Sequence, residues 1–195
     1  VGSEMCIRDR LKDKKQAHLR ERAAIGLGAV ASKVAGKNAP MPLGAEPWLV
    51  NAIPPLLDGY GDKNEAAKKA AEGAMGALVP LFPPEAAAEL LEMLYSVITS
   101  GTAKWQAKVG ALKIISRLAD LAYEQVGDEL TQITPVLTQG MHETKAEVSK
   151  QAIKTATKVC GVIDNNDIRP FIPDLVGCMD LSLIHISEPT RPLYI

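Results

Sequence analysis

Aromatic residues are scarce in this chain. They make up 4% of its 195 residues, although 47% of the residues are hydrophobic. The apolar content is mostly alanine, leucine, valine and isoleucine, which suits close helix packing more than a pleated sheet, where aromatic side chains are enriched. The composition therefore favours an all-α fold.

Long hydrophobic runs and paired cysteines are also missing from the sequence. No apolar run approaches the roughly 18 to 20 residues of a membrane span, so we expect a soluble protein with no membrane partner. Cys160 and Cys178 have neither paired spacing nor nearby histidines, which argues against a disulfide framework and a zinc site and fits a reducing compartment. We expect both to be small core residues of helices.

The charge balance gives no sign of a particular partner. The 22 basic and 23 acidic residues leave a net charge of −1. A chain with so little net charge carries no overall polyelectrolyte attraction to nucleic acid. A charged interaction would have to come from the distribution of the side chains instead.

Catalytic and ligand-binding motifs are absent as well. GLG at 26–28 lies in a helical pattern without a third glycine, HET at 142–144 has no second histidine four residues on, and DNND at 164–167 lacks the glycine and glutamate of a calcium loop. No G-x-x-x-x-G-K-[ST] phosphate loop occurs. We expect this chain to have no catalytic residues, cofactor, metal or small-molecule substrate of its own.

The two ends of the chain are unlike the helical sequence between them. The codons GTG GGC TCG GAG ATG TGT ATA AGA GAC AG encode VGSEMCIRD and begin residue 10. Their reverse complement encodes LSLIHISEPT, which is residues 181–190. One inverted DNA segment accounts for both ends, and it resembles the transposase adapter of sequencing libraries. We therefore expect residues 1–10 and 181–195 to be adapter-derived, and residues 11–180 to be the gene fragment.

Three segments of the chain repeat at an interval of 41 residues. They begin at Lys63, Lys104 and Lys145, follow short polar turns and run for about four helical turns each. Each has an alanine seven positions after its lysine, which predicts a close approach between paired helices. We interpret the segments as the second helices of three hairpins. The recurring alanines are Ala70, Ala111 and Ala152.

A first helix is expected before each second helix. EPWLVNAIPPLLDG, PEAAAELLEMLYSVIT and EQVGDELTQITPVLTQG carry apolar residues at helical spacing. Pro84 stands where a helix can begin without losing a hydrogen bond. Three other prolines fall inside the expected helices and should bend them: Pro54, Pro55 and Pro135. Three glycines follow as expected stop signals: Gly59, Gly101 and Gly140.

Half a hairpin is expected at each end of the array. A further second helix spans about 18–36, and 168–180 has the pattern of a truncated first helix. Paired helices at this period predict a HEAT-repeat α-solenoid with three complete hairpins. Each hairpin buries its apolar face by stacking on its neighbours, so the two ends should expose apolar surface.

The expected first helices are acidic and the expected second helices are basic. This predicts one acidic and one basic face, with Lys150, Lys154 and Lys158 forming a stripe at i, i+4 and i+8. A basic ridge could meet the phosphates of folded RNA. A solvated helix face with local ion pairs is the alternative. The candidate ribosome- or rRNA-facing residues are Lys104, Lys108, Lys150, Lys154 and Lys158.

Three stretches together resemble the N-terminal HEAT region of fungal-type translation elongation factor 3. They are AKWQAKVGALKIIS, ITPVLTQGMHETKAEVSKQA and VIDNNDIRPFIPDLVGCMD. His142 departs from this pattern, in which the turn carries a tryptophan. LKDKKQAHLRERAA and EPWLV are equally similar to the HEAT segment of a ribosome-binding activator of the general amino-acid control kinase.

The resemblance implies a part in translation. Elongation factor 3 is a cytoplasmic ABC-class ATPase that promotes release of tRNA from the ribosomal exit site, and its HEAT region is an arm that binds ribosomal proteins and rRNA. ATP would bind in later domains that this chain lacks. The alternatives are the kinase-activating scaffold, which continues with further HEAT repeats, and an unrelated protein-binding solenoid.

Overall fold

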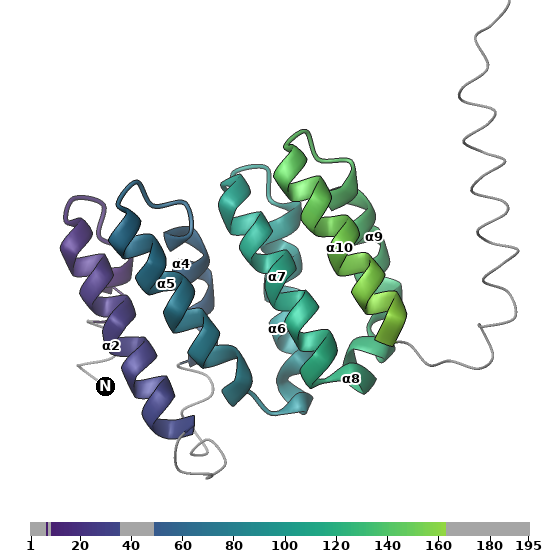
Figure 1. The fold of residues 1–195 in the computed structure, drawn as a ribbon, viewed down its shortest axis with the longest axis horizontal. Coiled ribbons are helices and arrows are strands. Elements are labelled where there is room, and N and C mark those ends of the chain that lie inside the picture. Colours follow the sequence, from purple (N-terminus) through teal and green to yellow (C-terminus); the bar gives the residue numbers. More distant parts are fainter. Residues whose placement is uncertain (1–6, 8, 36–48, 163–195) are drawn as a thin grey trace, which may run out of the picture. The chain divides into compact units, whose positions relative to one another are not determined.

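The computed structural model describes residue 7 and residues 9–35 and 49–162. Within these ranges the regular structure is entirely helical (Figure 1), which confirms the all-α prediction. None of the described helices is long and apolar enough to cross a membrane. The expected half hairpin at 168–180, the DNND segment, Cys178 and the C-terminal adapter-derived end lie outside the described residues.

Four second helices appear where the repeats predict them. The first three are α2 (Ala17–Ala35), α5 (Glu65–Leu78) and α7 (Trp105–Leu121), and the last is α10 (Ala146–Val162). In the view of Figure 1 they lie in front of the first helices. α2 packs against α5, and α7 packs against α10.

The first helices are α4 (Ile53–Gly59), α6 (Ala87–Thr99) and α9 (Leu130–Met141). They pack on α5, α7 and α10 respectively, which completes three hairpins. The last expected first helix is divided, because a short α8 (Tyr123–Asp128) precedes α9. Short 3₁₀ turns at Val79–Leu81 and Pro84–Ala86 connect α5 to α6.

The prolines have different effects at different positions. Pro84 opens the turn that leads into α6, as predicted. The expected bend at Pro54 and Pro55 is wrong, because α4 begins at Ile53 and both prolines lie in its first turn. N–H groups in a first turn have no partner within the helix, so proline removes nothing there. Pro135 lies inside α9, as predicted.

The repeat interval is not constant. The Asn64 side chain caps α5 by accepting from the N–H groups of Ala66 and Ala67 at 2.9 and 3.1 Å, whereas α7 begins directly after Lys104. The helix starts at 65, 105 and 146 are therefore 40 and then 41 residues apart. As a result, Ala71 rather than Ala70 is the buried counterpart of Ala111 and Ala152.

Two glycines allow the helices of a hairpin to approach closely. A Cβ atom at Gly59 would lie 2.9 Å from the Cβ of Ala71, and one at Gly140 would lie 3.2 Å from the Cβ of Ala152. Gly59 is the last residue of α4 and Gly140 lies inside α9, so the expectation that both follow their helices as stop signals is wrong. Gly101 does follow the end of α6. The close contacts confirm that small residues set the spacing within these two hairpins.

The stacking of second helices is interrupted between α5 and α7. These two helices make few contacts with each other, and α7 packs against α4 instead. The ring of Tyr60, which follows α4, lies so close to Gly110 that a Cβ there would be 2.5 Å from its Cδ2 and Cε2 atoms. Burial raises the pKa of the Tyr60 hydroxyl. The second helices therefore stack directly on one another only in the two pairs α2–α5 and α7–α10 of the described part.

Cys160 is exposed, so the prediction that it is a core residue is wrong. The buried residues of α10 recur at helical spacing. Cys160 directly follows the last of them and points away from the side that packs on α7 and α9. The buried set is Val148, Ala152, Thr155 and Val159.

Tyr95 on α6 has a buried hydroxyl with no hydrogen-bond partner among the described residues. Burial raises the pKa of this hydroxyl. A buried polar group without a partner loses its hydration and gains nothing in return. We expect Tyr95→Phe to increase the free energy of unfolding by up to about 1 kcal/mol, measured by urea denaturation. A clear loss of stability would show that the hydroxyl has a partner in solution.

Candidate functional site

Lys108 differs from the other candidate lysines because it is buried. Its side chain is 9% exposed, and its Nζ lies 2.7 Å from Oε2 of Glu143, in the turn before α10. This ion pair joins the second hairpin to the third. Lys108 therefore does not belong to an open basic face, and the prediction that it faces RNA is corrected on this point.

Lys104 and Lys158 also link neighbouring hairpins. The Nζ of Lys104 donates to the carbonyl oxygen of Gly61 at 2.8 Å. Lys158 forms an ion pair with Asp120 at the end of α7. Both side chains keep partial access to water. Both ammonium groups therefore have partners within the protein, as the alternative of local ion pairs predicts.

Lys150 and Lys154 are the two candidates left without an assigned partner. Both are exposed on α10, and neither makes an ion pair or side-chain hydrogen bond with any residue that the structure describes. Lys113 on α7 is exposed at the position equivalent to Lys154. The basic stripe of α10 therefore consists of two free lysines, next to the paired Lys158.

Arg20, which the repeat pattern does not predict as a functional residue, joins α2 to the first hairpin. Two nitrogen atoms of the Arg20 guanidinium group, on α2, donate to the Asp62 carboxylate. The distances are 2.6 Å from Nε to Oδ2 and 2.9 Å from Nη2 to Oδ1. The Nη1 of Arg20 donates to the carbonyl of Asp13 at 2.7 Å. The interval between α2 and α5 is longer than the others, so alignment of the repeats could not reveal this pair.

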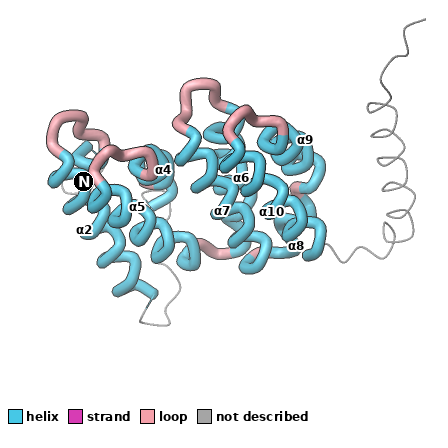
Figure 2. The backbone as a smooth tube through the Cα atoms, turned by 45° about the horizontal axis from the view of Figure 1, so that its top comes forward, coloured by secondary structure: helices cyan, strands magenta, loops and turns pink. Residues whose placement is uncertain are grey.

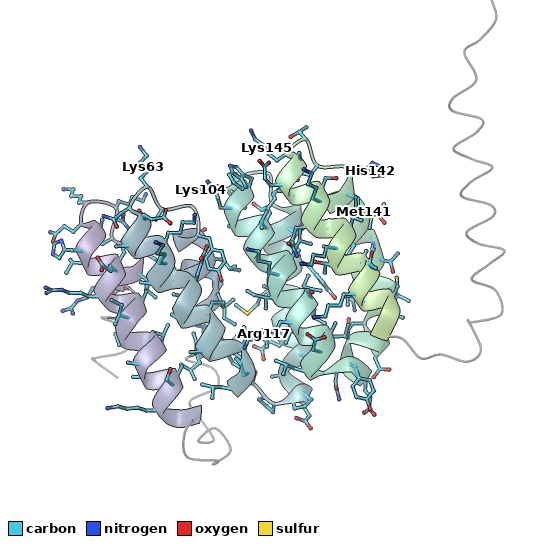
Figure 3. The ribbon with its side chains drawn as sticks, viewed as in Figure 1. Lys63, Lys104, Arg117, Met141, His142 and Lys145 are labelled. Carbon is cyan, nitrogen blue, oxygen red and sulfur yellow. The ribbon has the colours of Figure 1, made fainter. Side chains whose placement is uncertain are left out.

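The turns that precede the second helices lie along one edge of the described unit. Figure 2 shows these loops on the same side of the helices, and Figure 3 places Lys63, Lys104 and Lys145 at that end. We call residues 12–16, 60–64, 100–104 and 142–145 the turn edge. It carries six exposed lysines: Lys12, Lys14, Lys15, Lys63, Lys104 and Lys145.

The carboxylates of the turn edge are all engaged within the protein. Asp13 accepts from the backbone N–H groups of Gln16 and Lys15, and these bonds lower its pKa. Asp62 is bound by Arg20 and Glu143 by Lys108. The negative charges of these turns are thus held by partners, while the lysine side chains extend into solvent.

The Arg20–Asp62 pair should make stability depend on pH. The hydrogen bond from Arg20 lowers the pKa of Asp62, whose side chain is only 6% exposed. A lowered folded-state pKa contributes stability above the unfolded value of about 3.9, and this contribution is lost as pH falls through the folded value. We expect Asp62→Asn to cost about 1 to 2 kcal/mol at pH 7, and this cost to shrink as the pH falls below the unfolded value.

Urea unfolding at several pH values would test this prediction. Asp58→Asn is the matched control, because Asp58 is exposed in the same hairpin and no ion pair or hydrogen bond to its carboxylate is assigned in the described part. A loss for Asp62→Asn that stays constant from neutral to acid pH would contradict the assigned pair.

The described residues offer an exposed basic surface. Within residues 9–35 and 49–162, no cluster of three or more His, Cys, Asp or Glu side chains could hold a metal ion. The perturbed pKa values belong to hairpin links, capped turns and tyrosine hydroxyls. The candidate site is therefore the exposed basic surface, made of the α10 stripe and the turn edge.

Comparison with known proteins gives a consistent family. The model of the EF3 N-terminal HEAT repeat matches residues 5–156. Elongation factor 3 of Zygosaccharomyces rouxii is 36% identical over 169 residues, which cover 87% of this chain and 15% of the relative. The mRNA export factor elf1 of Schizosaccharomyces pombe is 35% identical over 169 residues, with 86% and 15% covered. Elongation factor 3A of Saccharomyces cerevisiae is 34% identical over 181 residues, with 93% and 16% covered.

Proposed function

Because this chain belongs to the family of elongation factor 3 N-terminal HEAT repeats, we propose that it is the ribosome-docking arm of an elongation factor 3-like protein. The observation that carries the proposal is the family match, which includes all three hairpins almost to the end of α10. The chain spans about 15% of the length of the relatives that it matches. Hydrolysis of ATP and release of exit-site tRNA would belong to the remainder of such a protein.

The mechanism that we propose for this part is docking without chemistry. Its surface would bind ribosomal proteins and rRNA in the cytoplasm and orient the ATPase domains of the parent. Links between neighbouring hairpins support this role, because a pre-organised surface loses less conformational entropy on binding than a flexible one. They are Arg20 with Asp62, Lys104 with Gly61, Lys108 with Glu143, Thr155 with Leu112, and Lys158 with Asp120.

Co-sedimentation of the full 195-residue chain with purified ribosomes would test the proposal. We expect the chain to pellet with ribosomes and to be released as the salt concentration rises, since phosphate contacts are salt-dependent. Failure to pellet at low salt would contradict ribosome docking. Lys150→Glu combined with Lys154→Glu tests the α10 stripe, with Lys33→Glu and Lys69→Glu as the control pair. Unchanged pelleting of the first pair would count against that stripe.

A role in mRNA export is the second candidate. The fission yeast export factor and the elongation factors are similar to this chain to the same degree, so sequence identity does not separate the two roles. Capture on poly(A) ribonucleoprotein particles, without pelleting on ribosomes, would favour export. The kinase-activating scaffold remains an alternative, and recovery of the downstream coding sequence distinguishes it by further HEAT repeats in place of ATP-binding cassettes.

A further inference from the structure

We propose that the turn edge, rather than a single helix face, binds the phosphate backbone of folded RNA. This inference rests on the proposed function, because rRNA is the folded RNA that a ribosome-docking arm meets. The starting observation is that lysines recur in each of the four turns and are all exposed. In Figure 3, the labelled Lys63, Lys104 and Lys145 come from three successive hairpins and lie at the same end of the helices.

Internal pairing leaves this edge positive. Asp62 and Glu143 would otherwise neutralise the charge of nearby lysines. Asp62 is paired with Arg20 and Glu143 with Lys108, and neither partner belongs to the turn edge. Lys14, Lys63 and Lys145 make no ion pair or side-chain hydrogen bond with the described part of the chain. Their ammonium groups are therefore available to an external anion.

The helix dipoles add charge of the same sign. α2, α5, α7 and α10 all begin at the turn edge. The first turn of a helix carries a partial positive charge from its free N–H groups. This contribution is secondary to the lysines, because the Asn64 side chain already occupies two of the N–H groups of α5. Both contributions favour a partner with distributed negative charge.

The composition of the edge favours nucleic acid over an acidic protein. Protein interfaces are depleted in lysine and depend on buried aromatic or apolar anchors. In the described part, the exposed large apolar residues all lie outside the four turns, and Trp105, which is 37% exposed, directly follows one of them. The helices of the packed pairs α2–α5 and α7–α10 are about 8 to 10 Å apart, and Lys104 bonded to Gly61 brings the two middle turns together. A row of flexible lysines can therefore reach several phosphates of an RNA duplex without reading its sequence.

The test compares two double variants with the same change in charge. Lys63→Gln with Lys145→Gln removes two lysines of the turn edge, whereas Lys33→Gln with Lys113→Gln removes two exposed lysines from α2 and α7. Binding of the full chain to a 20-base-pair RNA hairpin, a length of about two turns of the duplex, is measured over a range of salt concentrations. Thermal unfolding checks that both variants fold.

We expect the turn-edge variant to bind the RNA roughly tenfold more weakly, with a salt slope smaller by about 2, because each lysine lost removes about one phosphate contact. The control variant should bind like the parent chain. Equal binding by the parent chain and the turn-edge variant, or equal losses in both variants, would overturn the inference.

Ribosome pelleting of the same proteins separates this inference from the proposed function. If the turn-edge variant pellets normally and binds the hairpin normally, the edge is not the docking surface, although ribosome docking stands. The parent chain could instead pellet with ribosomes without binding the RNA hairpin. If an acidic peptide then displaces the chain from ribosomes, the partner is a protein and the inference is overturned. If hairpin binding depends on the edge and no protein pellets, the inference survives while ribosome docking fails.

Discussion

Replacing Gly110 by alanine is expected to reduce the free energy of unfolding by about 2 kcal/mol. Alanine is the better helix former by about 1 kcal/mol, and Gly110 lies in the middle of α7, so helix propensity alone predicts a gain. Packing outweighs it, because the new Cβ would lie 2.5 Å from two ring carbons of Tyr60 and 3.2 Å from Cδ2 of Leu57. The ring, held between α4 and α7, would have to move.

Gly73→Ala is the matched control for this prediction. Gly73 lies within α5, is exposed, and a Cβ there would have no neighbour within 4 Å. We expect this substitution to stabilise the chain by about 0.5 to 1 kcal/mol through helix propensity. Urea denaturation of both variants gives the comparison. A gain of similar size at Gly110 would mean that Tyr60 does not pack against α7 in solution.

Removing Glu143 is expected to cost more than removing its partner. Glu143→Ala leaves the Lys108 ammonium, on a side chain that is 9% exposed, without a counter-charge. Lys108→Met leaves a carboxylate on a side chain that is 26% exposed, which water can reach, and keeps the apolar stem packed. We expect losses of about 2 to 3 kcal/mol for Glu143→Ala and about 1 kcal/mol for Lys108→Met.

A double-mutant cycle tests whether the two residues interact directly. Chemical denaturation of Glu143→Ala, Lys108→Met and the double variant gives the coupling free energy. In the double variant no charge is left unpaired, so it should be more stable than Glu143→Ala alone. Losses that simply add would show that Lys108 and Glu143 do not form the ion pair.

The candidate lysines illustrate how far a helical pattern can locate a binding site. Their sequence spacing correctly places Lys150 and Lys154 on exposed helix surface. The same pattern groups Lys108 with them, although a carboxylate 35 residues later binds it in the interior. The charge and spacing of residues along one helix do not predict which side chains of the neighbouring hairpin lie within hydrogen-bond distance. Of the turn-edge lysines, the helical pattern indicates only Lys104, because the others precede the helices and belong to no stripe.

The sequence by itself determined the helices and their pairing. Apolar periodicity and polar turns are local properties, so they predicted the second helices closely and assigned the chain to the all-α class. Only the tertiary structure decided the rest: the 40-residue interval between the starts of α5 and α7, the packing role of Gly59 and Gly140, the interruption between α5 and α7, and which lysines remain free. These features depend on contacts between residues far apart in the chain, and such contacts follow from how close the helices come rather than from the pattern within any one of them.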